Sequence, residues 1–242
     1  MTSDVALGFD LDHTLVVDNK LEKTVALDMV AEIAASRGAS FDRVRADGAI
    51  DAALHAYRAG EQSLEAAIAG FFEQLVPGGG SASDVIDEAQ NFREHVLERA
   101  PAHIEGLPGV AAMFDALDAL GVPYAVLSNG WSPLQEEKAR AIGFRGPVFV
   151  SERIGVRKPS REAFATLATH FEVPLERIWY VGDDPYADCA GAHANGVTSV
   201  WFDWEGVAYP PQIARPDYVI HKLDELPSLV EGRLPRAANA PR

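Results

Sequence analysis

Two aspartates, Asp10 and Asp12, directly follow an apolar segment over residues 5–9. In an extended chain, a spacing of two residues puts both side chains on the same face. The segment is almost entirely apolar, which is typical of a parallel strand covered by helices on both faces, and functional groups gather at the carboxyl ends of such strands. Two acids this close repel each other, and a divalent cation would relieve that repulsion. Aspartate is also a common turn residue, so the pair alone leaves a metal site and a simple turn equally open.

A second polar group follows the apolar segment 124–127. Ser128, Asn129 and Gly130 offer a hydroxyl and backbone N–H groups that could hold phosphate oxygens at the end of a strand. The same three residue types also form ordinary turns. Taken alone, the turn is the stronger interpretation of this group.

Lys158 is the third candidate, because it precedes a predicted helix. Pro159 fits the first turn of a helix, which would place Lys158 at the helix N-terminus. Helix N-termini favour negative charge, so a lysine there has no role in helix stability. A lysine that binds an anion or steadies a carboxylate is therefore as good an interpretation as a solvated surface lysine.

The fourth group contains three aspartates after the apolar segment 178–181. Gly182 allows close backbone approach, and Asp183 stands nearest to the strand end. Asp184 also suits the N-cap of a helix that begins at Pro185, so one acid of this group has a structural interpretation. Asp183 is the better metal-ligand candidate. Carboxylates without nearby histidine or cysteine favour Mg2+.

The elements that would position these residues differ between the two halves of the chain. Helical spacing of apolar residues predicts four helices and no strand between residues 16 and 104. These helices are expected around 21–37, 41–57, 64–75 and 85–97. In the second half, strands and helices alternate. The expected strands are 124–127, 148–150, 178–181, 198–201 and 218–220, and the expected helices are 110–120, 134–142, 161–171, 187–195 and 223–230.

This alternation predicts an α/β fold with a parallel sheet and right-handed crossovers. The first strand belongs to the same sheet, so the helical block is an insertion placed directly after the carboxylate pair. We expect a core over 1–17 and 105–232, an all-helical cap over 18–104 that acts as a lid, and a disordered tail over 233–242.

Composition limits the possible partners. The 242 residues carry a formal net charge of -15, which argues against nucleic acid or an anionic membrane as the main partner. The single cysteine, Cys189, excludes an intramolecular disulfide and fits a reducing compartment. No signal peptide or membrane segment is visible. The sequence therefore predicts a soluble, cytoplasmic protein, and leaves monomer and homodimer open.

Together these motifs resemble the haloacid dehalogenase (HAD) superfamily of phosphatases. The four motifs of that family occur in order at predicted strand ends, namely Asp10-x-Asp12-x-Thr14, Ser128, Lys158-Pro159 and Gly182-Asp183 with Asp188. The resemblance covers the whole chain apart from the tail. It implies a Rossmann-like core, and the helical insertion resembles the first cap type of the family.

The resemblance also implies catalytic roles. Asp10 would be the nucleophile that forms an aspartyl-phosphate. Asp12 would act as general acid for the leaving group and then as general base for water. Four residues would contact the phosphate, namely Thr14, Ser128, Asn129 and Lys158.

For the metal, the resemblance implies a Mg2+ ion held by Asp10, by the backbone carbonyl of Asp12 and by Asp183. Asp188 would orient Lys158 or a metal-bound water. Asp184 is an additional acid next to this motif, so the supporting acidic role stays open between Asp184 and Asp188.

The implied function is a Mg2+-dependent phosphomonoesterase that acts on a small phosphorylated metabolite. A 2-haloacid dehalogenase would use the same nucleophile without the metal or the second acid, so Asp12 and Asp183 count against it. A phosphomutase stays open, because these motifs say nothing about cap behaviour. A phosphonate hydrolase would need a cap lysine, and only Lys20 and Lys23 are present. A non-catalytic binding module is disfavoured, because unpaired buried carboxylates cost stability.

Overall fold

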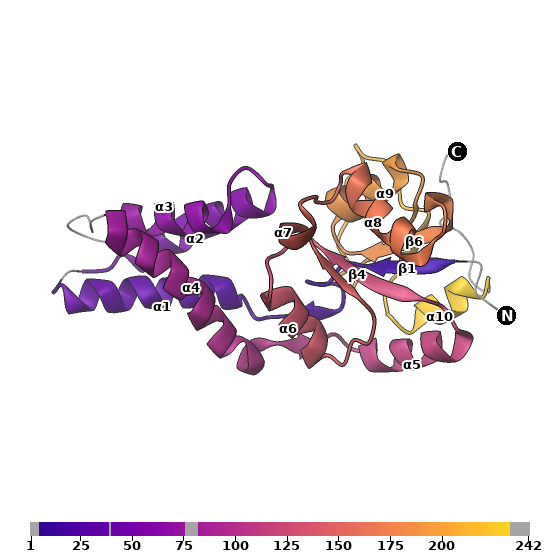
Figure 1. Ribbon diagram of the computed structural model, residues 1–242, viewed down its shortest axis with the longest axis horizontal. Helices are drawn as coiled ribbons and strands as arrows, with labels where there is room; N and C mark the ends of the chain where they lie inside the picture. Colours follow the sequence, from indigo (N-terminus) through magenta and orange to yellow (C-terminus); the bar gives the residue numbers. More distant parts are fainter. Residues whose placement is uncertain (1–4, 39, 76–81, 233–242) are drawn as a thin grey trace. The chain divides into compact units, whose positions relative to one another are not determined.

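The computed structural model describes residues 5–38, 40–75 and 82–232. The chain divides into two compact units, one formed by Met1–Val17 with Ile104–Arg242 and the other by Asp18–His103. The first unit carries a parallel sheet and the second is helical (Figure 1). The tail over 233–242, which we expected to be disordered, lies outside the described residues.

Six strands form the sheet of the first unit, in the order β5-β4-β1-β6-β7-β8. They are β1 (Ala6–Phe9), β4 (Tyr124–Ser128), β5 (Val148–Val150), β6 (Ile178–Gly182), β7 (Thr198–Phe202) and β8 (Tyr218–Ile220). All neighbouring pairs are parallel. β1 lies between β4 and β6, although both follow it by more than a hundred residues in the chain. The predicted α/β fold, a Rossmann-like parallel sheet with an inserted helical segment, is confirmed.

Helices cover both faces of this sheet. They include α5 (Val110–Leu120), α8 (Arg161–Phe171), α9 (Gly191–Ala194) and α10 (Glu225–Val230). Side chains alternate along a strand, so Leu7 and Phe9 pack in the cluster that contains α5 and α10, whereas Ala6 packs with α8 and α9. A Cβ atom at Gly8 would lie 2.4 Å from Cδ1 of Leu167 in α8. The missing side chain at Gly8 therefore allows α8 to lie close against β1.

One short strand, β2 (Val16–Val17), contradicts the prediction that no strand occurs between residues 16 and 104, and its partner β3 (Glu105–Gly106) lies just after this range. The two strands pair antiparallel. Strands of two residues are too short to show an alternating pattern, so the sequence contained no signal for them. This ribbon brings together the two points where the chain leaves and re-enters the sheet-bearing unit.

The four predicted helices of the second unit are confirmed. They are α1 (Leu21–Ser36), α2 (Arg43–Arg58), α3 (Leu64–Leu75) and α4 (Ala82–His103). Asp42 caps α2, because its carboxylate accepts hydrogen bonds from the backbone N–H groups of Val44 and Arg45. α4 runs beyond the predicted end and contains Pro101. Pro101 has no backbone N–H and so cannot donate to the carbonyl of residue 97, yet the helix continues to His103.

The remaining elements of the first unit adjust other predicted boundaries. They are α6 (Leu134–Ala141), α7 (Ser151–Ile154), the short 3-10 helix η1 (Leu175–Arg177) and η2 (Pro185–Ala190), which is wound as a π-helix. The helix predicted over 187–195 is thus η2 followed by α9. The helix after Lys158 begins at Arg161 with Ser160 as its N-cap, so Pro159 is not in its first turn and Lys158 lies in the preceding loop.

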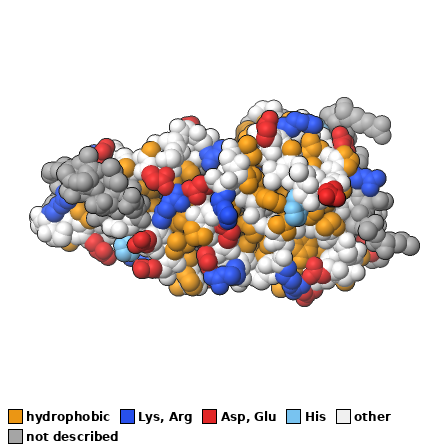
Figure 2. Space-filling model, viewed as in Figure 1, with side chains coloured by type: hydrophobic (Ala, Val, Ile, Leu, Met, Phe, Trp, Pro, Cys, Tyr) orange, Lys and Arg blue, Asp and Glu red, His pale blue; other side chains and the backbone are white. Residues whose placement is uncertain are grey.

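Charges of both signs lie side by side on one face of the molecule (Figure 2). On the face shown in Figure 2, Lys and Arg side chains lie among Asp and Glu side chains, without a continuous basic area over the coloured residues. Among the described residues, no helix combines the length and the apolar character needed to cross a membrane.

Candidate active site

Three strand ends meet in the middle of the sheet. β4, β1 and β6 are neighbours, and their register pairs Phe9 with both Val126 and Val181. Because the three strands are parallel, the residues that follow them come to the same edge. The predicted groups at Asp10, Ser128 and Asp183 are therefore brought together by the fold.

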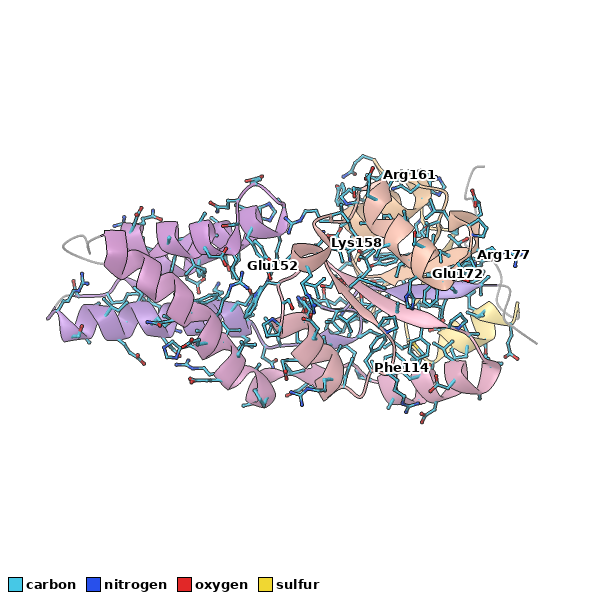
Figure 3. The ribbon with its side chains drawn as sticks, viewed as in Figure 1. Phe114, Glu152, Lys158, Arg161, Glu172 and Arg177 are labelled. Carbon is cyan, nitrogen blue, oxygen red and sulfur yellow. The ribbon has the colours of Figure 1, made fainter. Side chains whose placement is uncertain are left out.

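Lys158 joins this edge from the loop between α7 and α8. Its Nζ atom lies 2.6 Å from Oδ1 of Asp10 and 2.7 Å from Oδ1 of Asp188. The side chain, labelled in Figure 3, is almost completely buried, with 4% of the residue exposed. A buried ammonium group needs such partners. The structure therefore favours a lysine that stabilises carboxylates over a solvated surface lysine.

Asn129 holds the backbone of this lysine. Its Nδ2 atom donates to the carbonyl oxygen of Lys158, and its Oδ1 atom accepts from the N–H of Lys158, both at 2.8 Å. Asn129, which we predict to contact the phosphate, thus also contacts Lys158 through both ends of its amide. Ser128 is buried at the end of β4.

Negative charge is concentrated around Lys158. Burial raises the pKa of Asp10 above its usual value, although Lys158 acts in the opposite direction. Burial, with repulsion from Asp10 and Asp188, raises the pKa of Asp183 to about 8. Burial also raises the pKa of Asp188 to about 7, against the effect of Lys158. Burial opposes the charge of Lys158, but Asp10 and Asp188 outweigh it and raise the pKa of Lys158 well above its usual value.

Three of these carboxylates lie close enough to hold one metal ion. Oxygen atoms of Asp10, Asp183 and Asp188 all lie within 4.8 Å of one another. A Cβ atom at Gly182 would lie 2.2 Å from Oδ2 of Asp188, so only glycine allows this approach. Carboxylate oxygens are the ligands that Mg2+ prefers, and a divalent cation would offset the excess of acid over the single ammonium of Lys158.

The metal set predicted from the sequence differs from this cluster at one position. The prediction contained Asp10, Asp12 and Asp183, whereas the cluster contains Asp188 and not the side chain of Asp12. Asp12 was expected to bind the metal through its backbone carbonyl, and its carboxylate contacts Lys138 and Gln135. Thr14, expected at the phosphate, donates from Oγ1 to Oδ1 of Asp183 at 2.8 Å.

Asp184 and Asp188 take different positions. The carboxylate of Asp184 accepts hydrogen bonds from the N–H groups of Tyr186 and Ala187 at 2.7 and 3.0 Å, which makes Asp184 the N-cap of η2. Asp188 contacts Lys158 through Oδ1, and its Oδ2 accepts from the N–H of Asp184 at 3.1 Å. The geometry thus favours Asp188 for the supporting acidic role.

Two residues that we did not identify from the sequence contact Asp12. Nζ of Lys138 donates to Oδ1 of Asp12 at 2.6 Å, and Nε2 of Gln135 donates to Oδ2 at 2.9 Å. A signal was present, because Leu134, Lys138 and Ile142 are spaced by four residues and share one helix face. A lysine on an otherwise apolar face indicates a buried partner.

A cavity borders the same edge. It has a volume of about 280 Å³, and its lining includes His13, Asp183, Trp201 and Trp204. The indole N–H of Trp201 donates to the carbonyl oxygen of Asp183 at 3.1 Å. The carboxylate cluster is therefore next to open space that a small ligand could enter.

Comparisons with known proteins identify the family of this chain. The family described as haloacid dehalogenase-like hydrolase matches residues 6–196. The chain is 31% identical over 160 residues to phosphoserine phosphatase of Thermus thermophilus, covering 64% of this chain and 61% of that protein. It is 27% identical over 124 residues to (S)-2-haloacid dehalogenase 2 of a Pseudomonas species, covering 50% of this chain and 54% of that protein.

A solved structure resembles the chain over almost its full length. The HAD-hydrolase YfnB from Bacillus subtilis, bound to magnesium, has a TM-score of 0.67 and 21% identity, and the match covers 96% of this chain and 100% of that chain. At this identity the resemblance shows the fold. The two curated relatives above are matched over only 61% and 54% of their length.

Proposed function

Because the chain belongs to the haloacid dehalogenase-like hydrolases, we propose that it is a Mg2+-dependent phosphatase. It would hydrolyse the phosphate monoester of a small metabolite through an aspartyl-phosphate intermediate on Asp10. The observation that carries this proposal is the grouping of Asp10, Asp183 and Asp188 within 4.8 Å, with Lys158 in contact with two of them.

In the first step, a carboxylate oxygen of Asp10 attacks the phosphorus atom and the bond to the leaving oxygen breaks. Asp12 gives its proton to that oxygen, a form of help that is typically worth about 10²–10⁴-fold. Coulomb repulsion opposes the approach of Asp10 to a phosphate dianion. Lys158, which lies 2.6 Å from Asp10, reduces this repulsion.

In the second step, a water molecule attacks the phosphorus atom of the aspartyl-phosphate. Asp12 takes a proton from the water, the bond between phosphorus and Asp10 breaks, and inorganic phosphate is released. The covalent route divides one difficult hydrolysis into two easier steps. A Mg2+ ion held by Asp10, Asp183 and Asp188 would neutralise phosphate charge in both steps.

The rival reaction is dehalogenation, which one relative catalyses by name. A carboxylate that displaces halide needs neither an acid for the leaving group nor a cation for a phosphate. Asp12, Asp183 and Asp188 would then have no chemical task. Burial disfavours the negative charge of Asp183 and Asp188 and raises their pKa values to about 8 and 7, so dehalogenation leaves the presence of these acids unexplained. Phosphate transfer uses all of these groups and is the better account of the site. A mutase, which would return the phosphoryl group to its substrate, is distinguished by whether phosphate is released.

The phosphorylated substrate is proposed to be a small soluble molecule, such as the phosphorylated amino acid named for the Thermus relative. The net charge of -15 disfavours nucleic acid and anionic membranes as partners. A monomer or a homodimer would serve this function equally.

The direct test is phosphate release from a panel of phosphorylated metabolites, with an aryl phosphate as a general substrate. We expect turnover that disappears with a chelator, returns with Mg2+ and is poorly supported by Ca2+, whose larger and looser coordination misplaces the nucleophile. Asp10→Asn should abolish turnover, because an amide cannot attack phosphorus. Full activity in chelator, or halide release from 2-haloacids without phosphate release, would refute the proposal.

A further inference from the structure

A single helix binds both carboxylate oxygens of Asp12. Lys138 and Gln135 stand three residues apart on α6, so their side chains are neighbours on one face. Lys138 donates to Oδ1 at 2.6 Å and Gln135 donates to Oδ2 at 2.9 Å. We call these two residues the α6 clamp. The two aspartates of the first motif thus each contact a buried lysine, Asp10 through Lys158 and Asp12 through Lys138.

Local sequence makes room for the α6 clamp. A Cβ atom at Gly130 would lie 1.9 Å from Nε2 of Gln135, so any other residue at 130 would displace the amide. Trp131 and Leu134 are fully buried and anchor the start of α6. The end of the motif Ser128-Asn129-Gly130 therefore has a structural task, which is to let Gln135 reach Asp12.

Stability does not explain the α6 clamp. Only 1% of Lys138 is exposed, and a buried ion pair is often no more stable than well-packed apolar residues in the same place. Oε1 of Gln135 is also buried without a hydrogen-bond partner among the described residues, which is unfavourable. The side chain of Asp12 is 35% exposed, so the carboxylate that these residues hold remains open to solvent and ligand.

We propose that Lys138 and Gln135 are positioning residues that hold Asp12 for proton transfer in the reaction proposed above, on which this inference rests. Two donors on two carboxylate oxygens fix the plane of the carboxyl group. The charge of Lys138 also stabilises the carboxylate of Asp12 that forms once its proton has passed to the leaving group. Lys158 stabilises the carboxylate of the nucleophile Asp10, so each of the two aspartates has its own lysine.

The leaving group provides a readout that a merely structural role would not change. An alkoxide is a poor leaving group and needs the proton from Asp12, whereas an activated phenolate leaves without it. Lys138→Met keeps an unbranched side chain, shorter by one atom, but removes its charge. We expect Lys138→Met to lower kcat by about 10²-fold with an alkyl phosphate, within the range of general acid–base help, and by a much smaller factor in the phenol burst from an activated aryl phosphate.

A double-mutant cycle with Asp12→Asn tests whether Lys138 acts through Asp12. In the Asp12→Asn background, Lys138→Met should cause little further loss of steady-state kcat with the activated aryl phosphate, because hydrolysis of the aspartyl-phosphate uses Asp12 as the base. Gln135→Leu is a second variant, in case Lys138→Met does not fold, and should show the same dependence on the leaving group with a smaller loss. Arg140→Met is the matched control, because Arg140 is exposed on the same helix and pairs with Glu137.

Three results would overturn the inference. The first is a kcat equal to that of the parent protein in both Lys138→Met and Gln135→Leu. The second is an equal loss of rate with the alkyl phosphate and with the activated aryl phosphate. The third is a double variant in which the separate losses from Lys138→Met and Asp12→Asn multiply. The proposed function fails separately, if Asp10→Asn remains active or if no phosphate is released. An inactive Asp10→Asn together with fully active clamp variants would refute the α6 clamp alone.

Discussion

Lys158 shows how much of this site depends on one side chain. Its ammonium group contacts Asp10 and Asp188, and its backbone is held by Asn129. The contact between Lys158 and Asp188 is buried on both sides. Removing one partner of a buried charge pair leaves the other without compensation, which is strongly unfavourable. The support of Lys158 by Asn129 can be removed without that penalty, because Asn129 carries no charge.

Asn129→Ala should misplace Lys158 without removing any charge. Two hydrogen bonds to the backbone of Lys158 are lost, and a small displacement of a catalytic group can cost about 10²-fold in rate. We expect kcat with the best available phosphate ester to fall by at least about tenfold, at the lower end of that effect.

Asn195→Ala is the control for this prediction. Asn195 donates to the carbonyl oxygens of Pro159 and Gly191 but not to Lys158. Steady-state kinetics and thermal denaturation of both variants separate the two effects. Equal losses of kcat in both variants would show that the loop as a whole matters, and not the hold on Lys158.

At the scale of elements, the sequence predicted the helices and strands that carry an apolar pattern and missed the features that depend on single tertiary contacts. Each long helix shows helical spacing of apolar residues and each strand of the sheet is a short apolar run, so all were predicted, although α4 continues from the predicted end at residue 97 to His103. β2 and β3 have two residues each and carry no period. The motif order placed Asp10, Ser128 and Asp183 at strand ends, where parallel pairing brings them together.

Side-chain partners were harder to predict, because they depend on tertiary approach. The contact of Asn129 with the backbone of Lys158 was not predicted. Thr14 bonds Asp183. The α6 clamp was missed, although the apolar face of α6 includes a lysine. Such contacts join residues far apart in the chain, as with Asp12 and Lys138. The apolar face of α6 indicates that Lys138 has a buried partner, but it does not identify that partner as Asp12.

Packing of α8 against β1 gives a prediction about stability. A Cβ atom at Gly8 would lie 2.4 Å from Leu167 and 2.8 Å from Tyr180. Gly8→Ala should therefore reduce the free energy of unfolding by about 1–3 kcal/mol, the usual cost of overpacking. Urea denaturation measures this change.

Gly48→Ala is the opposite case, because Gly48 lies inside α2 and a Cβ atom there would have no neighbouring atom within 4 Å among the described residues. Alanine is favoured over glycine in a helix by about 0.5–1 kcal/mol, so this variant should be more stable than the parent. If Gly8→Ala is as stable as the parent while Gly48→Ala behaves as expected, the close approach of α8 to Gly8 is wrong.

At the scale of the whole molecule, the chain is a sheet-bearing unit interrupted by a helical unit. The interruption follows the loop of Asp10 and Asp12 by only a few residues, and β2 and β3 join its two ends. All candidate catalytic and metal-binding residues belong to the sheet-bearing unit. The helical unit is thus free to differ in sequence without changing the chemistry, and we predict that it determines which phosphate ester is accepted.

Replacing residues 20–100 with a short linker tests this prediction. We expect the shortened chain to lose discrimination among phosphorylated metabolites but to hydrolyse an activated aryl phosphate slowly, because a good leaving group needs few specific contacts. Circular dichroism establishes that the sheet-bearing unit remains folded. A folded, shortened chain that selects among metabolites as the full chain does would contradict the prediction.

The central claim is that Asp10 carries the phosphoryl group during turnover. The most direct measurement mixes the protein with Mg2+ and an activated aryl phosphate, stops the reaction with acid within the first turnover, and locates the phosphoryl group by peptide mass spectrometry. We predict a phosphoryl group on Asp10 that disappears as substrate is exhausted and never forms in Asp10→Asn. Phosphate release without a phosphoryl group on Asp10 at any time, or with the group on another residue, would contradict the account.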